Sequence, residues 1–171
     1  MTATTQELYS APIHSPLGHL LAVVDRSGAL VALDLDARTS RWSSLPPDER
    51  RARKVLEALK HYFDGTLREF TLALAPEGTP FQRRVWEELR RIPYGTTISY
   101  AELAQRLGDP KAVRALGRAN GANPIAIVVP CHRVIGADGT LTGYAGGLDK
   151  KRALLAHEAR VAGRPVQLAL L

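Results

Sequence analysis

The chain has 171 residues and a mass of 18.6 kDa, and its 45% hydrophobic content is sufficient for one or two small packed domains. A single cysteine excludes an internal disulfide, and one sulfur with five scattered histidines does not supply the ligands of a structural zinc site. We therefore expect no metal and no cofactor. No apolar run approaches the length of a membrane span and the first ten residues lack a leader pattern, so we expect a cytoplasmic protein without a membrane partner.

The net charge of +6 is unevenly distributed along the sequence. Residues 1–79 contain nine Lys and Arg against ten Asp and Glu, whereas residues 80–171 contain fourteen against seven. A basic half of this kind suits a polyanion such as nucleic acid, because its phosphates favour clustered cations. An arginine-rich, solvated surface explains the same charge, and composition alone does not separate the two.

The first half of the chain predicts a small sheet followed by a helix. Three consecutive antiparallel strands are expected at residues 8–13, 17–24 and 29–35, separated by turn residues. Residues 48–63 place apolar side chains at helical spacing until Asp64-Gly65, and Phe70–Leu74 alternates as a fourth strand would. Residues 75–78 form the expected boundary, which gives a strand-rich domain over 1–78 and a second domain over 79–171.

The second half begins with three predicted helices. Thr79 and Gln82 have capping-box spacing for a helix that runs to about Arg91, and Trp86 is expected on its buried face. Ser99 and Glu102 have the same spacing for a helix that Gly108 ends. A third helix begins near Pro110, with buried Val113, Leu116 and Ala119, and the pair of helices is typical of a helix-turn-helix.

Small residues gather on this third helix beside Arg114 and Arg118. Ala115, Gly117 and Gly121 indicate that something approaches the backbone closely, because glycine is unfavourable inside a helix. A narrow DNA groove and a tightly packed neighbouring helix are both consistent with this composition.

The apolar run of residues 124–129 predicts a buried strand, and Cys131 follows it directly. A glycine-rich loop then extends over residues 136–147, before a last helix at 150–162. Lys150, Lys151 and Arg152 are interpreted as the solvated start of that helix.

Cys131 is the candidate nucleophile. A lone buried cysteine is often inert, but His132 can accept the thiol proton, and Glu158 can orient the imidazole and stabilise its cation. Adjacent side chains of an extended segment point to opposite faces, so either a bridging water molecule or a turn between Cys131 and His132 is required. We predict the water.

The segment Pro-Cys-His-Arg-Val resembles the O6-alkylguanine-DNA alkyltransferase family, and the motifs around it strengthen the likeness. Two motifs flank it: Arg118-Ala119-Asn120-Gly121-Ala122-Asn123-Pro124 before it and Gly143-Tyr144-Ala145-Gly146-Gly147 after it. The likeness as a whole covers residues 79–160. It implies an α/β fold of two small domains. The N-terminal domain has an antiparallel, RNase H-like sheet with one main helix, and the C-terminal domain is mostly helical with a helix-turn-helix.

The resemblance implies an enzyme of direct damage reversal, a methylated-DNA–protein-cysteine methyltransferase that acts once per molecule. The alkyl group passes irreversibly from O6-alkylguanine, and less readily from O4-alkylthymine, to Cys131. The implied partner is double-stranded DNA with alkylated bases, bound through its minor groove by a protein that is a monomer in solution. Cooperative binding along DNA is left open.

The resemblance also implies roles for particular residues. His132 and Glu158 generate the thiolate, Asn123 braces the turn, and Tyr100 donates its hydroxyl to the extruded base. Arg114 replaces that base in the stack, while Gln82 and Ala101 contact the DNA backbone. The base pocket consists of backbone groups of Cys131 and Val134 with a wall formed by Tyr144, Ala145 and Gly146. By the same resemblance, Lys151 lies near the active-site loop.

Departures from the family pattern qualify these expectations. Ala145 is small, which indicates a pocket with room for alkyl groups larger than methyl, and the absence of earlier cysteines argues against the zinc site of some members. Asn120 is more polar than the residue of some relatives, and its packing role is left open. Two other functional classes remain as alternatives: a thiol hydrolase for small acyl substrates and a helix-turn-helix regulator without chemistry.

Overall fold

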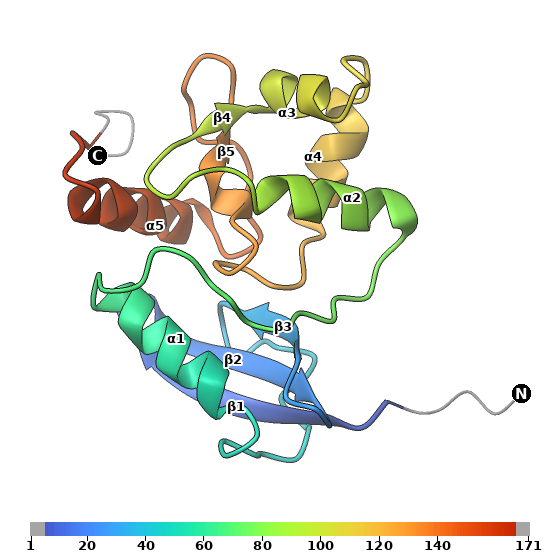
Figure 1. Ribbon diagram of the computed structural model, residues 1–171, viewed down its shortest axis with the longest axis vertical. Coiled ribbons are helices and arrows are strands. Elements are labelled where there is room, and N and C mark those ends of the chain that lie inside the picture. Colours follow the sequence, from blue (N-terminus) through green and yellow to red (C-terminus); the bar gives the residue numbers. More distant parts are fainter. Residues whose placement is uncertain (1–5, 167–171) are drawn as a thin grey trace, which may run out of the picture. The chain divides into compact units, whose positions relative to one another are not determined.

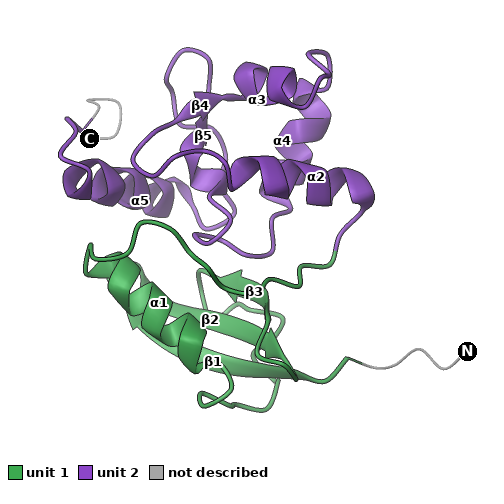
Figure 2. Ribbon diagram, in the orientation of Figure 1, with its two compact units in different colours: residues 1–77 green, residues 78–171 purple. Residues whose placement is uncertain are grey.

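The computed structural model describes residues 6–166 and has the mixed α/β architecture that was expected. The chain divides into two compact units, Met1–Glu77 and Gly78–Leu171, which Figure 2 distinguishes by colour. Within the described residues, no helix combines the length and the apolar character needed to cross a membrane.

The first unit is built on a three-stranded antiparallel sheet (Figure 1). Its strands are β1 (Leu8–Ser15), β2 (Gly18–Asp25) and β3 (Leu30–Asp34), in the order β1-β2-β3, so the three predicted strands are confirmed. A two-residue turn joins β1 to β2, and the pair Ser15↔Gly18 closes that hairpin. The buried side of helix α1 (Arg53–Phe63) includes Val55 and Leu59.

Two predictions for this unit were wrong in detail. Residues 70–74 add no strand to the sheet, because only a single parallel bridge joins Leu74 to Leu30. The helix begins at Arg53 rather than at residue 48, since Asp48 accepts the backbone N–H of Arg51 in a preceding turn. A short polar side chain that bonds to nearby backbone competes with a helical start in this way.

The second unit consists mainly of helices. They are α2 (Pro80–Leu89), α3 (Tyr100–Arg106), α4 (Val113–Gly121) and α5 (Leu148–Val161), and the short strands β4 (Ile98–Ser99) and β5 (Val134–Ile135) pair in parallel. The capping box of Thr79 and Gln82 is confirmed, and Ser99 accepts the backbone N–H of Glu102 as the N-cap of α3. The four predicted helices are therefore present, with ends shifted by a few residues.

Helix α4 is held against α2 by its buried side. The indole Nε1 of Trp86 donates to the carbonyl of Ala119 at 2.8 Å, and Leu116 and Ala119 are buried as expected. Val113 is not, because α4 begins at this residue and leaves 39% of its surface exposed. One side of α4 is therefore buried and hydrogen-bonded to α2, whereas its first residue is accessible.

The predicted strand at residues 124–129 was wrong, although its burial was right. The segment folds as a series of turns in which Ile125, Ile127 and Val129 are buried. Ile127 has a φ of 70°, a left-handed conformation that is strained for a β-branched residue. A continuous apolar run cannot distinguish a buried strand from a buried turn, and here a strained turn delivers the chain to Cys131.

Candidate active site

Cys131 begins a single turn of 3-10 helix, η1 (Cys131–Arg133), directly before β5. The expectation of an extended segment was therefore wrong: the N–H of Cys131 bonds the carbonyl of Val129 and that of Arg133 bonds the carbonyl of Pro130. Only 5% of the surface of Cys131 is exposed. The cysteine is thus held on a tight turn and is almost fully buried.

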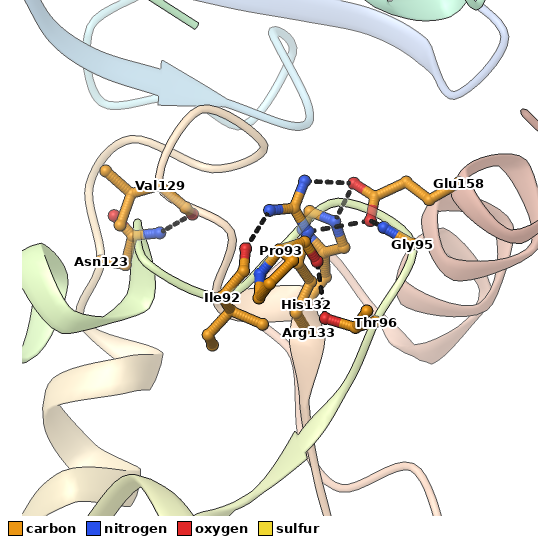
Figure 3. A network of polar contacts seen from close by, with 9 residues as sticks. All are labelled: Ile92, Pro93, Gly95, Thr96, Asn123, Val129, His132, Arg133 and Glu158. Carbon is orange, nitrogen blue, oxygen red and sulfur yellow. Dashed lines mark hydrogen bonds and ion pairs between the residues drawn. The ribbon is translucent and has the colours of Figure 1, made fainter. Parts of the chain in front are cut away.

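His132 and Glu158 form a buried pair, with Nε2 of the imidazole 2.8 Å from Oε1 of the carboxylate (Figure 3). A carboxylate oxygen can only accept, so Nε2 carries the proton and Nδ1 keeps its lone pair. Among the described residues Nδ1 has no hydrogen-bond partner, although it is buried. Burial lowers the pKa of His132 despite the opposing carboxylate, so the ring is a neutral base at physiological pH.

The carboxylate of Glu158 is held from three directions (Figure 3). Arg133 donates through Nε at 2.8 Å and Nη2 at 2.9 Å, while its Nη1 donates to the carbonyl of Ile92. The amide of Gly95 donates at 3.3 Å from a turn with a φ of 73°, where a Cβ would lie 2.8 Å from that of Ala162. Burial raises the pKa of Glu158, but His132 and Arg133 outweigh it and hold the carboxyl ionised.

Asn123 holds the turn that precedes the cysteine. Its Nδ2 donates to the carbonyl of Val129 at 2.8 Å (Figure 3). The same Nδ2 donates to the carbonyl of Ile125 at 3.4 Å, and Oδ1 accepts the N–H of Ile125. These bonds satisfy backbone groups that have no strand partner, which explains how the buried turn is tolerated. One side chain, that of Asn123, thus holds the turn that leads to Cys131.

Burial raises the pKa of the Cys131 thiol, because a thiolate is poorly stabilised where water is excluded. Contacts with Asn123, the charge of Lys151 and the nearby Tyr144 act in the opposite direction. The Tyr144 hydroxyl interacts with the thiol, but it finds no partner in full hydrogen-bond geometry among the described residues, and burial raises its pKa too. The cysteine is therefore a protonated thiol until a base removes its proton.

Lys151 is not part of a solvated helix start. Its side chain is fully buried, and its Nζ donates to the carbonyls of Val134 at 2.7 Å and Thr142 at 3.2 Å. Burial lowers its pKa to about 8, although Cys131 opposes that shift. The ammonium group thus joins β5 to the glycine-rich loop beside the thiol.

Tyr100 and Asn120 meet near the carbonyl of Cys131. The Nδ2 of Asn120 lies 3.3 Å from the Tyr100 hydroxyl and 3.4 Å from that carbonyl, so one amide group links α3, α4 and η1. Asn120 is 3% exposed, and its Oδ1 has no hydrogen-bond partner among the described residues. The side chain whose role was left open is therefore a buried part of this site.

The residues predicted to contact DNA lie at accessible positions on α2, α3 and α4. Arg114 and Ala101 are exposed, whereas Gln82 is half-buried and its Oε1 completes the cap of α2. A Cβ added at Gly117 or Gly121 would meet nothing within 4 Å. Tight helix packing does not explain these two glycines, because the space beside them is open.

Of the pocket residues, Val134 is buried, Tyr144 and Gly146 are half-buried and Ala145 is exposed. The structure adds Arg133, Lys151 and Asn120, to which sequence reasoning gave no active-site role. Their polarity resembles that of ordinary surface residues, and only the fold shows that they are buried. In the described part of the chain, no three His, Cys, Asp or Glu side chains are grouped as metal ligands would be.

Comparison with known proteins gives a consistent result. Residues 80–160 match the family model described as the 6-O-methylguanine DNA methyltransferase DNA-binding domain. The methylated-DNA–protein-cysteine methyltransferase of Mycolicibacterium paratuberculosis is 50% identical over 153 residues, which cover 86% of this chain and 90% of the relative. That of Methanosarcina acetivorans is 48% identical, with 86% and 96% covered.

Solved structures agree with these relatives. The crystal structure of Mycobacterium tuberculosis O6-methylguanine methyltransferase has a TM-score of 0.83 and 45% identity, and the match covers 95% of this chain and 98% of that one. The crystal structure of Mycobacterium tuberculosis OGT in complex with DNA has a TM-score of 0.83 and 44% identity, with 95% and 99% covered. The similarity therefore extends over both compact units.

Proposed function

Because the chain belongs to the methylated-DNA–protein-cysteine methyltransferase family, we propose that it repairs DNA by transferring the alkyl group of O6-alkylguanine to Sγ of Cys131. The observation that carries this proposal is the buried His132–Glu158 pair beside the lone cysteine, with Nδ1 of the imidazole unpartnered among the described residues. A neutral imidazole with a free lone pair is the group that a buried thiol needs in order to react.

The proton and electron balance of the transfer follows from these groups. His132 takes the thiol proton through Nδ1, by way of the predicted water, and Glu158 stabilises the imidazolium that forms. The thiolate then displaces the alkyl carbon, so that an S–C bond forms and the C–O6 bond breaks with its electron pair on guanine. Guanine regains one proton overall, which equals the proton that the thiol lost.

Donors and acceptors around the thiol suit the guanine leaving group. The Tyr100 hydroxyl donates a hydrogen bond or a proton to the departing base, which lowers the barrier to breaking the C–O6 bond. The carbonyls of Cys131 and Val134 are acceptors that match the exocyclic amino group of guanine. Tyr144, Ala145 and Gly146 form the other wall, and the small Ala145 leaves room for alkyl groups larger than methyl.

Access to O6 requires the nucleotide to leave the duplex, at a cost of a few kcal/mol. Arg114, exposed on α4, fills the gap in the stack, while Gln82 and Ala101 contact the backbone from the first turns of α2 and α3. The open space beside Gly117 and Gly121 supports a close approach of α4 to the minor groove. The relative solved in complex with DNA supports the same partner.

The thioether product is stable, so we propose that each molecule acts once. We also propose that the protein acts as a monomer. O4-alkylthymine presents a similar oxygen and is a poorer substrate in this account. Water does not displace an alkyl group from a thioether sulfur at a useful rate, so the restored DNA leaves and the alkylated protein remains.

The proposal is tested with duplex DNA that carries a radiolabelled O6-methylguanine. The wild-type protein should acquire the label, whereas Cys131→Ser should acquire none and keep DNA affinity within about twofold, because a serine hydroxyl is a far weaker nucleophile than a thiolate. Filter binding and electrophoresis of the protein measure both quantities. Labelling of Cys131→Ser would refute the assignment, and repeated release of a small product would indicate a hydrolase.

A further inference from the structure

We infer that Asn120 is a positioning residue that makes the Tyr100 hydroxyl a proton donor toward the base, an assignment that rests on the proposed function. The inference starts from its single amide nitrogen, which contacts two oxygen atoms of the active site at 3.3 and 3.4 Å. Those two oxygens, the Tyr100 hydroxyl and the Cys131 carbonyl, consequently lie within two hydrogen-bond lengths of each other.

The Cys131 carbonyl fixes which way the Asn120 amide points. A carbonyl oxygen can only accept, so the atom facing it must be the NH₂ group and not Oδ1. With the amide in that orientation, its second N–H is directed at the Tyr100 oxygen. Both amide hydrogens are thereby committed, one to each oxygen.

This orientation determines the role of the Tyr100 hydroxyl. An oxygen that accepts from Asn120 cannot direct its own hydrogen at the same nitrogen, because that nitrogen has no acceptor capacity. The hydroxyl hydrogen is therefore free to turn toward a base in the pocket. Without Asn120, the hydroxyl would be free to rotate and present a lone pair to the base instead.

The cost of Asn120 argues against a packing role. Its Oδ1 is buried and has no hydrogen-bond partner among the described residues, although Asn120 itself is only 3% exposed. An apolar side chain of similar volume would fill this space without an unsatisfied polar atom. Filling this space therefore does not require an amide, whereas the hydrogen bond to the Cys131 carbonyl does.

Lys151 donates a hydrogen bond to the second pocket carbonyl, that of Val134. Its Nζ donates to Val134 at 2.7 Å, as Asn120 donates to Cys131, so each proposed acceptor for the guanine amino group is held by a buried donor. The Cys131 carbonyl also accepts the backbone N–H of Val134, so a base amino group shares this oxygen with two protein donors. Asn120 thus contacts both the proposed donor, the Tyr100 hydroxyl, and one proposed acceptor, the Cys131 carbonyl.

The test is a double-mutant cycle on the single-turnover rate of methyl transfer from O6-methylguanine duplex. We expect Asn120→Leu to lower this rate about tenfold in the wild-type background and to have no further effect when Tyr100→Phe is present. Asn120→Asp should be slower than Asn120→Leu, because a carboxylate would draw the tyrosine hydrogen away from the base. Equal losses in both backgrounds, or an Asp variant as fast as the Leu variant, would overturn the inference.

A second reaction separates positioning from a general effect on the thiol. Iodoacetamide alkylates Cys131 with iodide as the leaving group, and iodide needs no proton donor, so Asn120→Leu should react at the wild-type rate. A matching tenfold loss would overturn the inference. If Asn120→Leu does not fold, Asn120→Ala enters the same cycle. Wild-type protein that transfers no methyl group would refute the proposed function itself, whereas an additive cycle with normal wild-type transfer refutes only the role of Asn120.

Discussion

At the level of single residues, the site contains buried charged side chains, of which some have a partner of opposite charge and one has only carbonyl partners. Arg133 and Glu158 satisfy each other through two short hydrogen bonds, whereas Lys151 has only carbonyl partners at its Nζ among the described residues. A buried carboxylate and guanidinium can remain charged together, but an ammonium without a carboxylate is poorly stabilised. The lowered pKa of Lys151, to about 8, follows from this difference.

This lowered pKa makes the stability of the fold pH-dependent. Between pH 8 and 10.5 the unfolded chain holds the Lys151 proton more often than the folded one, so the free energy of unfolding rises with pH through that window. We expect the wild type to gain up to about 3 kcal/mol relative to Lys151→Met across it.

Urea unfolding of both proteins at a series of pH values measures this gain. Lys151→Met is the matched control, because it keeps the length of the side chain and removes the titrating group; the loss of its two hydrogen bonds lowers stability at every pH and does not create a pH dependence. A difference between the two proteins that stays constant from pH 8 to 10.5 would contradict a burial-lowered pKa.

At the scale of elements, α4 has two sides with different purposes. One side is fixed by the Trp86 indole and carries Asn120 into the site. Beside Gly117 and Gly121 the space is open, and Arg114 is exposed on the same helix. The glycines cost helix stability without improving internal packing, which is explained if DNA must come close to this backbone.

Gly117 therefore offers a test in which stability and binding change in opposite directions. Gly117→Ala should raise the free energy of unfolding by about 1 kcal/mol, because alanine favours the helix and meets no neighbour. Both Gly117→Ala and the bulkier Gly117→Leu should weaken DNA binding, the latter more strongly. Chemical denaturation and fluorescence anisotropy give the two quantities, and unchanged affinity of Gly117→Leu would place the DNA elsewhere.

Elements with local signals could be predicted from the sequence, whereas elements set by tertiary contacts could not. The Thr79 and Gln82 cap and the three strands of the first sheet were correct, because spacing alone determines them. The turn before Cys131 was mistaken for a strand, since its hydrogen bonds go to the side chain of Asn123 rather than to a neighbouring strand. No periodicity in the sequence reports such a bond.

The candidate site shows the same division. Motifs singled out Cys131, His132 and Glu158, and the structure brings the last two into contact although 26 positions separate them. Arg133, Lys151 and Asn120 were missed in these roles, because a charged or amide side chain is normally exposed and only the folded structure shows it to be buried.

At the scale of the whole molecule, the acidic and basic halves of the sequence correspond closely to the two compact units. The unit that contains the cysteine also contains the excess of positive charge, which suits a polyanionic substrate. The family similarity extends over both units, so the first unit is part of the enzyme and not an unrelated addition.

In the proposed reaction, one sulfur atom takes the alkyl group and keeps it. The most direct measurement is the intact mass of the protein after incubation with an excess of duplex DNA that contains O6-methylguanine. We expect a gain of a single methylene mass, located on Cys131, with one guanine restored per protein molecule. An unchanged mass with restored DNA, or more guanines restored than protein molecules present, would contradict it.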